Sequence, residues 1–262
     1  MNLELNDKTA LISGSTKGIG FAIASQLAAE GARVIVNGRS DQAVASAQQQ
    51  ILHDLPEARV EGFAGDLATA EAVRALFLRF PTVDILVNNL GIFEPKPFEE
   101  IPDEDWRRFF DVNVISGARL SRTYVSGMKQ RKWGRIIFIS SESAIQIPVE
   151  MVHYGTTKTA LLGLSRGIAE TCAGTGVTVN AVLPGPTRSA GVEEFVTQLS
   201  GGQSFEAFEK EFFTSVRPSS LIKRFATPAE VATLVAFVCS PLAATITGAA
   251  LRADGGVVRA CF

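Results

Sequence analysis

Tyr154 and Lys158 have side chains and a spacing that suit proton transfer. They are four residues apart in a stretch with helical periodicity, so one face of the expected helix carries both. A phenol has an ordinary pKa of about 10, and a neighbouring ammonium stabilises the phenolate and lowers that pKa. Ser141 precedes Tyr154 by thirteen residues and can hydrogen-bond a substrate oxygen. Together the three residues predict a general acid for reducing a carbonyl, or a general base for oxidising an alcohol.

A glycine-rich turn near the N-terminus has the composition of a phosphate-binding loop. It lies between a predicted strand and a predicted helix. Glycine there permits a tight turn, lets the backbone approach a pyrophosphate and lets helix and strand pack closely. The amide groups at the helix N-terminus then face the phosphates. We therefore expect this turn to bind a dinucleotide through Gly14, Ser15, Thr16, Lys17, Gly18, Ile19 and Gly20.

The end of the second predicted strand bears on the type of nicotinamide cofactor. An NAD-binding protein usually has Asp or Glu there, which accepts hydrogen bonds from the ribose 2′-hydroxyl. This chain has no carboxylate before Asp41, and instead has Arg39, which can pair with a 2′-phosphate. Lys17 in the glycine turn adds a second positive charge. The pattern predicts NADP(H) in preference to NAD(H), against the alternative that both cations are ordinary solvated surface residues.

Short apolar strands and amphipathic helices alternate along the whole chain. This alternation predicts one doubly wound α/β domain over residues 1–262, a three-layer Rossmann fold with a parallel sheet between helices. Strands are expected at 8–13, 33–37, 60–64, 83–87, 135–140, 177–183 and 249–252. Helices are expected at 18–30, 41–52, 70–79, 103–130 with Asp103 as N-cap, 152–172, and from the capping box at Thr227 to about Cys239.

One irregular segment, at about 185–224, interrupts the alternation. Its position after a strand end suits a substrate lid within the same domain. The phenylalanines of this segment, at positions 195, 205, 208, 212 and 213, could line the substrate site or pack beneath the lid. Arg188 or Arg217 could serve an anionic substrate, although the surrounding composition favours a hydrophobic or mixed ketone.

Composition excludes several classes of protein. Lys plus Arg total 25 and Asp plus Glu 27, and the resulting net charge of −2 argues against binding to nucleic acid or to anionic membranes. No apolar run has the roughly 18 residues of a membrane span, and no signal peptide is expected. The three dispersed cysteines favour a reducing compartment, hence a cytoplasmic protein. The two histidines, His53 and His153, fall in no metal-binding motif, so no metal is expected.

Six motifs, in order and spacing, resemble those of the short-chain dehydrogenase/reductase family, particularly its 3-oxoacyl-ACP-reductase-like members. The glycine turn resembles the family's cofactor motif. The resemblance implies that Asp66 and Leu67 contact the adenine end of the cofactor, and that Asn89 and Gly91 lie in the motif beside it. The remaining matches are Asn113, Ser141, Tyr154 and Lys158 of the catalytic tetrad, Pro184, Gly185 and Thr187 beside the nicotinamide, and the C-terminal signature at 252–256.

The family's mechanism implies an NADPH-dependent oxidoreductase that transfers a hydride between the cofactor and a carbonyl or secondary alcohol. Tyr154 would act as general acid or base, and Lys158 would also bond the nicotinamide ribose. Asn113 would hold a water that resupplies protons. The alternatives are an NADP-dependent alcohol or sugar dehydrogenase working in the oxidative direction, and a non-catalytic NADP(H)-sensing protein. Leu90 replaces the usual alanine of its motif, and a homotetramer or homodimer is expected.

Overall fold

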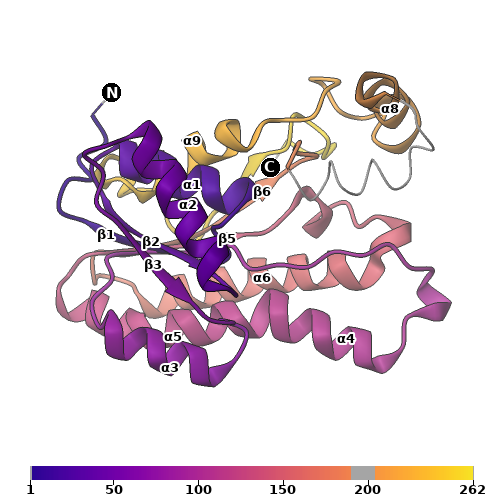
Figure 1. The fold of residues 1–262 in the computed structure, drawn as a ribbon. Helices are drawn as coiled ribbons and strands as arrows, with labels where there is room; N and C mark the ends of the chain where they lie inside the picture. Colours follow the sequence, from indigo (N-terminus) through magenta and orange to yellow (C-terminus); the bar gives the residue numbers. More distant parts are fainter. Residues whose placement is uncertain (1, 190–203, 262) are drawn as a thin grey trace.

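The computed structural model describes residues 2–189 and 204–261, and its centre is a seven-stranded parallel sheet (Figure 1). The strand order is β3-β2-β1-β4-β5-β6-β7, and every neighbouring pair is parallel. This confirms the predicted doubly wound Rossmann fold. The strands are β1 (Thr9–Ile12), β2 (Arg33–Gly38), β3 (Val60–Ala64), β4 (Ile85–Asn88), β5 (Gly134–Ile139), β6 (Val177–Pro184) and β7 (Ala250–Ala253).

Helices cover both faces of the sheet and make three layers (Figure 1). One core cluster joins the sheet to α1 (Gly18–Ala29), α2 (Asp41–Asp54) and α9 (Pro228–Cys239). The other joins it to α3 (Ala70–Arg79), α5 (Ser116–Gln130) and α6 (Val152–Thr171). Because both faces are covered, the central strands are buried along their length, which explains their unbroken apolar runs.

Side chains close the helices at several predicted places. Thr227 accepts a hydrogen bond from the backbone N of Glu230, and the Glu230 carboxylate accepts one from the backbone N of Thr227. This reciprocal capping box confirms the predicted start of α9. Asp103 was a wrong choice of N-cap, because the cap position belongs to Pro102 and Asp103 is the first helical residue of α4 (Asp103–Phe110). With two more acidic residues it stabilises the positive end of the helix dipole instead.

The predicted long helix at 103–130 is present but not uniform. Between α4 and α5 the chain forms one π-helical turn, η2 (Asp111–Ile115), with Asn113 at its centre. A π turn inserts a residue into the helical repeat and often lies at a functional site. Apolar periodicity did not reveal it, because the helix continues in the same direction on both sides (Figure 1).

The strand order places the predicted motifs at one edge of the sheet. From β1 the chain winds outward to β2 and β3, then crosses back so that β4 pairs with the other side of β1. The loops after β1 and β4 therefore separate at a topological switch point, which is where open α/β sheets bind ligands. The glycine turn and residues 89–91 occupy these two loops.

The predicted insertion at 185–224 is described at both ends, while Phe195 lies outside the described residues. Its second part contains α8 (Phe205–Glu211), followed by a π turn, η5 (Phe212–Val216). Phe225 packs against four phenylalanine rings of this part, with centroids 5.0–6.4 Å away: Phe205, Phe208, Phe212 and Phe213. Figure 1 shows α8 standing apart from the main sheet. None of the described helices is long and apolar enough to cross a membrane.

Candidate active site

A cavity of about 620 Å³ opens at the carboxyl ends of the central strands. Its wall comes from the loops after β4, β5 and β6, from α6, and from the segment that follows α8. Of the predicted catalytic residues, Ser141, Tyr154 and Lys158 line it. Of the predicted cofactor-binding residues, it is lined by Ile19, Asn89, Gly91, Pro184, Gly185 and Thr187.

Tyr154 and Lys158 lie on the cavity side of α6, where Lys158 is buried and Tyr154 is half-buried. The Lys158 Nζ atom lies 5.6 Å from the centre of the Tyr154 ring and donates a hydrogen bond to the carbonyl of Ile139 at 3.0 Å. Burial lowers the pKa of Lys158 to about 8. Burial also raises the pKa of Tyr154 well above its ordinary value, and a hydrogen bond with Ser141 acts in the opposite direction. Burial thus disfavours the charged form of both groups.

Asn113 fastens the loop after β4 to the π turn. Its Oδ1 accepts a hydrogen bond from the backbone N of Ile92 at 2.8 Å, and its Nδ2 donates to the carbonyl of Ile92 at 3.0 Å. The same Nδ2 donates to Thr157 Oγ1 at 2.9 Å. A Cβ added at Gly91 would lie 3.2 Å from Lys158 Nζ. The structure therefore brings Asn113 and Lys158 together around Gly91, where an added side chain would press against the Lys158 ammonium.

The glycine turn fits a phosphate group. Gly14 and Gly18 have φ angles of 61° and 63°, which favour glycine. A Cβ added at Gly20 would lie 2.4 Å from Asn89 Nδ2 and 2.6 Å from the carbonyl oxygen of Gly14. Because Gly20 has no side chain, α1 can pack closely against the glycine turn and the loop after β4. The N-cap of α1, Lys17, makes no side-chain cap, and no acidic residue stands in the first turn. This helix end therefore suits an anion, because backbone donors rather than a side chain or carboxylate face outward there.

Sequence reasoning missed how Asn37 supports that turn. Its Oδ1 accepts a hydrogen bond from the backbone N of Gly14 at 3.0 Å. Its Nδ2 donates to the carbonyls of Phe63 and Gly65 at 3.1 and 3.0 Å. Asn37 is buried at the end of β2. An amide inside an otherwise apolar strand was the available signal, since buried polar groups are normally hydrogen-bonded.

The residues predicted to contact the adenine end lie at the ends of β2 and β3. Arg39 and Asp66 are exposed, and Lys17 in the adjoining turn is exposed as well. The Asp66 carboxylate accepts a hydrogen bond from the backbone N of Ala68 at 3.0 Å. Leu67 is completely buried in the core, so only its backbone can face a cofactor.

The loop after β6 is fixed by the C-terminal segment. A Cβ added at Gly185 would lie 2.5 Å from the carbonyl oxygen of Asp254, so this position requires glycine. Thr187 donates to the carbonyl of Gly185 at 2.9 Å and pairs with Ala226 in a short bridge. The C-terminal signature thus acts as a support for the cavity wall.

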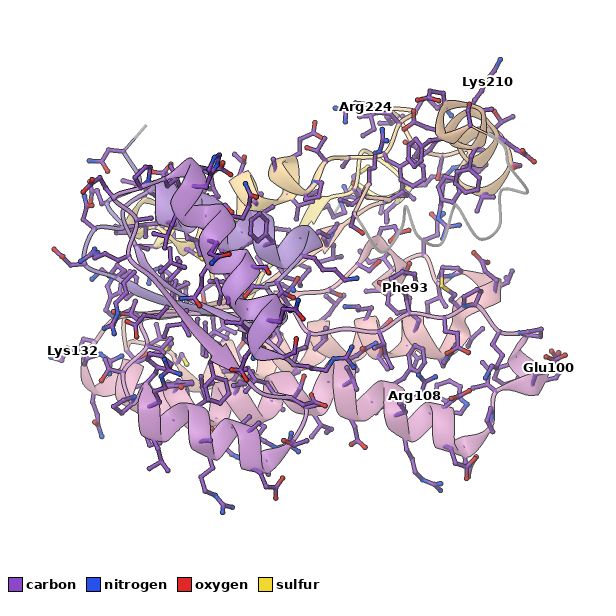
Figure 2. All side chains as sticks on the ribbon, viewed as in Figure 1. Phe93, Glu100, Arg108, Lys132, Lys210 and Arg224 are labelled. Atoms are coloured by element: carbon purple, nitrogen blue, oxygen red, sulfur yellow. The ribbon has the colours of Figure 1, made fainter. Side chains whose placement is uncertain are left out.

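The remaining wall is apolar with an acidic group of side chains. Phe93, Met151, Phe208, Phe212 and Val216 contribute the apolar part. Figure 2 shows Phe93 between the lower helical layer and α8, the helix that carries Lys210. Arg217 faces two carboxylates: its Nε lies 3.3 Å from Glu142 Oε1 and its Nη1 3.7 Å from Glu150 Oε1. This guanidinium is already paired within the protein, which weakens the interpretation that Arg217 serves an anionic substrate.

Two residues beside the motifs lie away from the cavity. Leu90 packs against Gly14, where an added Cβ would be 3.1 Å from its Cδ2, and it is not among the described residues of the cavity wall. The larger side chain that replaces the usual alanine at this position therefore does not narrow the cavity. His153 is fully buried against Phe109, with ring centroids 4.0 Å apart, rather than directed toward the cavity.

Comparisons with known proteins agree with this geometry. A family model described as enoyl-(acyl carrier protein) reductase matches residues 14–258. The oxidoreductase YvaG of Bacillus subtilis is 50% identical over 100% of both chains. D-beta-hydroxybutyrate dehydrogenase of Cupriavidus necator is 35% identical over 97% of this chain and 99% of its own. The chain belongs to the short-chain dehydrogenase/reductase family.

The structural comparison extends the match to the whole fold. L-Sorbose reductase from Gluconobacter frateurii, solved in complex with NADPH and L-sorbose, superposes with a TM-score of 0.93. It is 31% identical and covers 99% of this chain and 100% of its own. The protein is thus a short-chain dehydrogenase/reductase in sequence and in fold, and an oxidoreductase by family.

Proposed function

We propose that this enzyme is an NADP(H)-dependent reductase or dehydrogenase that interconverts a carbonyl and a secondary alcohol. The observation that carries the proposal is the convergence of Ser141, Tyr154 and Lys158 on one cavity. The uncapped glycine turn adjoins that cavity through Ile19 and Asn89. One set of groups suits proton transfer and the other suits a dinucleotide phosphate.

The nicotinamide, when bound, supplies or accepts the hydride. Tyr154 is the proposed general acid for reduction and general base for oxidation, and burial, which raises its pKa, further favours the protonated phenol in the free enzyme. Ser141 is the proposed hydrogen-bonding partner of the reacting oxygen. Lys158 would hold the cofactor ribose and stabilise the phenolate. Asn113 would hold a proton-supplying water, and its hydrogen bonds to Ile92 and Thr157 would keep the loop and α6 in register.

The preference for NADP(H) rests on Arg39 and Lys17. Both are exposed cations, Lys17 in the glycine turn and Arg39 directly after β2, and no carboxylate follows β2 before Asp41. Asn37, near the end of β2, is committed to hydrogen bonds with the backbone of the glycine turn and of the segment after β3. The NADPH in the L-sorbose reductase complex supports the same proposal. The other proposed cofactor contacts are those of the glycine turn, Asp66, the backbone of Leu67, Asn89, Gly91 and the loop after β6.

A neutral, partly apolar substrate suits the cavity. Its far wall is aromatic and aliphatic, and its carboxylates at positions 142, 150 and 211 outnumber Arg217 on that side. An anionic substrate would meet this acidic excess without a free partner from Arg217. The described parts of the 185–224 segment supply several of these wall residues, which supports its role as a substrate lid.

A panel of neutral ketones, followed by NADPH absorbance, tests the proposal. Consumption of NADPH with at least one ketone, absent in Tyr154→Phe, is the expected result. The panel also separates the alternatives: an enzyme that turns over only alcohols or polyols with NADP⁺ would be an oxidative dehydrogenase. Cofactor binding with no turnover of either panel would instead indicate a sensing protein.

A homo-oligomer, dimer or tetramer, is also proposed. The apolar C-terminal segment gives this proposal little support, because Val257 and Val258 are buried within the chain itself. Arg252 fixes this segment by donating to the carbonyls of Val258 and Ala260. Light scattering coupled to size-exclusion chromatography decides the question, and a monomer across concentrations would reject the proposal.

A further inference from the structure

Glu142 is a buried carboxylate in the cavity wall, one residue after Ser141. Its side chain is only 7% exposed, and burial of a carboxylate is unfavourable unless donors and opposite charge compensate. Three donors reach its Oε2: Ser141 Oγ at 2.5 Å, the backbone N of Ser143 at 2.8 Å and Ser143 Oγ at 3.1 Å. Its Oε1 faces Arg217 Nε. The protein has therefore built a complete set of partners around this carboxylate.

The contact with Glu142 fixes the direction of the Ser141 hydroxyl. A carboxylate only accepts hydrogen bonds, so Ser141 must be the donor. A serine hydroxyl has one hydrogen and two lone pairs. The backbone N–H of Ser143 is shared between Glu142 Oε2 and Ser141 Oγ, and its contact with Oγ, at 3.1 Å, engages one lone pair of Ser141. Toward the cavity, Ser141 therefore presents its remaining lone pair, which is an acceptor.

This polarity distinguishes an alcohol from a carbonyl. An alcohol can donate its hydroxyl hydrogen to the free lone pair of Ser141. A carbonyl oxygen only accepts, so Ser141 can donate to it only after its hydrogen turns away from Glu142. A hydrogen bond to a charged acceptor is stronger than one between neutral groups, and this opposes the turn.

Arg217 is paired with Glu142 and so bears on the hydrogen bond between Glu142 and Ser141. It comes from the segment that follows η5, 75 positions after Glu142, and its side chain is 11% exposed. Its guanidinium lies between Glu142 and Glu150. Because it neutralises part of the carboxylate charge, it links the segment beyond α8 to the hydroxyl of Ser141.

We propose that Glu142 is a positioning residue that holds the hydrogen of Ser141, so that the site offers an acceptor to the reacting oxygen, and that Arg217 sets the strength of this hold. The inference rests on the proposed function in one respect, since it takes Ser141 to meet the reacting oxygen.

The pKa of Tyr154 can test this proposal, because it would not change if Glu142 and Arg217 only stabilised the fold. Apart from burial, the pKa of Tyr154 is raised by the charge of Glu142 and lowered by that of Arg217, and a hydrogen bond donated by Ser141 would lower it further. Glu142→Gln removes the charge and frees the Ser141 hydrogen for Tyr154, and both changes lower the pKa of Tyr154. Arg217→Gln acts in the opposite direction. The other charged side chains of the described cavity wall are Lys158, Glu150 and Glu211, and these stay unchanged in both variants.

Neutron diffraction on deuterated crystals of the cofactor-free enzyme locates the hydrogen directly. We expect the Ser141 deuterium to point at Glu142 Oε2 in the wild type and in the control Glu211→Gln, which alters a carboxylate of the same cavity wall that is not paired with Arg217 or Ser141 among the described contacts. In Glu142→Gln it should point to Tyr154 or the cavity. A wild-type deuterium that already points to Tyr154 overturns the proposal.

The pH profile of alcohol oxidation gives the second test. The midpoint of kcat/KM should fall by about 1 pH unit in Glu142→Gln, rise in Arg217→Gln, and stay in place in Glu211→Gln. A lower kcat with unchanged midpoints in both site variants means a structural role and overturns the proposal. If Glu142→Gln does not fold, the upward shift in Arg217→Gln carries the test. If the wild type oxidises no alcohol, the proposed function has failed, and the neutron map still decides the orientation of Ser141.

Discussion

The imidazole of His153 packs against the ring of Phe109, with centroids 4.0 Å apart, directly beside Tyr154 in the sequence. Trp106, which lies on α4 together with Phe109, also contacts the His153 ring. Neither ring nitrogen of this buried histidine has a hydrogen-bond partner among the described residues. Burial lowers its pKa, partly offset by Asp105 and Glu94, while Lys96 and Arg108 add to the lowering. The helix that carries the proposed acid–base residue is thus anchored by a neutral aromatic contact.

This anchor predicts a loss of stability in mild acid. The unfolded chain takes up a proton at His153 near its ordinary pKa of about 6.5, whereas the folded protein does so only at lower pH. The stabilisation is therefore complete above pH 6.5 and is lost as the pH falls toward the lowered value. The expected slope is up to about 1.4 kcal/mol of unfolding free energy per pH unit.

Urea unfolding between pH 7 and pH 5 measures this slope. His153→Phe should flatten it, since the ring remains and the titrating group is gone. His53→Phe is the matched control, because His53 is exposed and paired with Asp54. Equal slopes in wild type and His153→Phe would show that other groups govern the acid sensitivity.

Removal of the Tyr154 hydroxyl should abolish turnover without weakening the fold. We expect Tyr154→Phe to reduce kcat by at least about 100-fold, because general acid–base catalysis contributes 10²–10⁴. NADPH binding, followed by fluorescence titration, should remain within a few-fold of wild type. Tyr124→Phe is the control among the chain's two tyrosines, since its hydroxyl donates to the carbonyl of Phe80 in the core. Near-normal turnover in Tyr154→Phe contradicts the proposed role.

Reversal of charge at position 39 should change the cofactor preference. Arg39→Asp removes a partner for the 2′-phosphate and supplies an acceptor for a ribose hydroxyl. A hydrogen bond to a charged group contributes about 1.5–3 kcal/mol, so the NADP(H)/NAD(H) ratio of kcat/KM should fall roughly 10- to 100-fold. Arg74→Asp, an exposed arginine on α3, controls for net charge. An unmoved ratio in Arg39→Asp would remove Arg39 from the cofactor site.

The sequence was sufficient for the sheet, the alternation of helices and the main motifs. Strands such as β6 are apolar throughout because both of their faces are covered, and Tyr154 and Lys158 are recognisable from their helical spacing. The π turn at Asn113 was not predictable from periodicity, because it depends on hydrogen bonds to a loop 21 positions earlier. The Glu142–Arg217 pair spans 75 positions and joins segments that only the completed fold brings together.

Asn113 should affect both stability and activity, unlike Tyr154. Asn113→Ala leaves the part-buried backbone of Ile92 without its partners on both the N–H and the carbonyl, so we expect a loss of about 1–3 kcal/mol in unfolding free energy. Activity should fall as well, because Gly91 and Lys158 adjoin the loosened loop. Thr157→Val removes one contact of Asn113 and keeps the loop bonds, so its effect should be smaller. Urea unfolding and kcat, measured on the same preparations, test this order. A fully stable but inactive Asn113→Ala would indicate that Asn113 acts only in proton supply and does not brace the site.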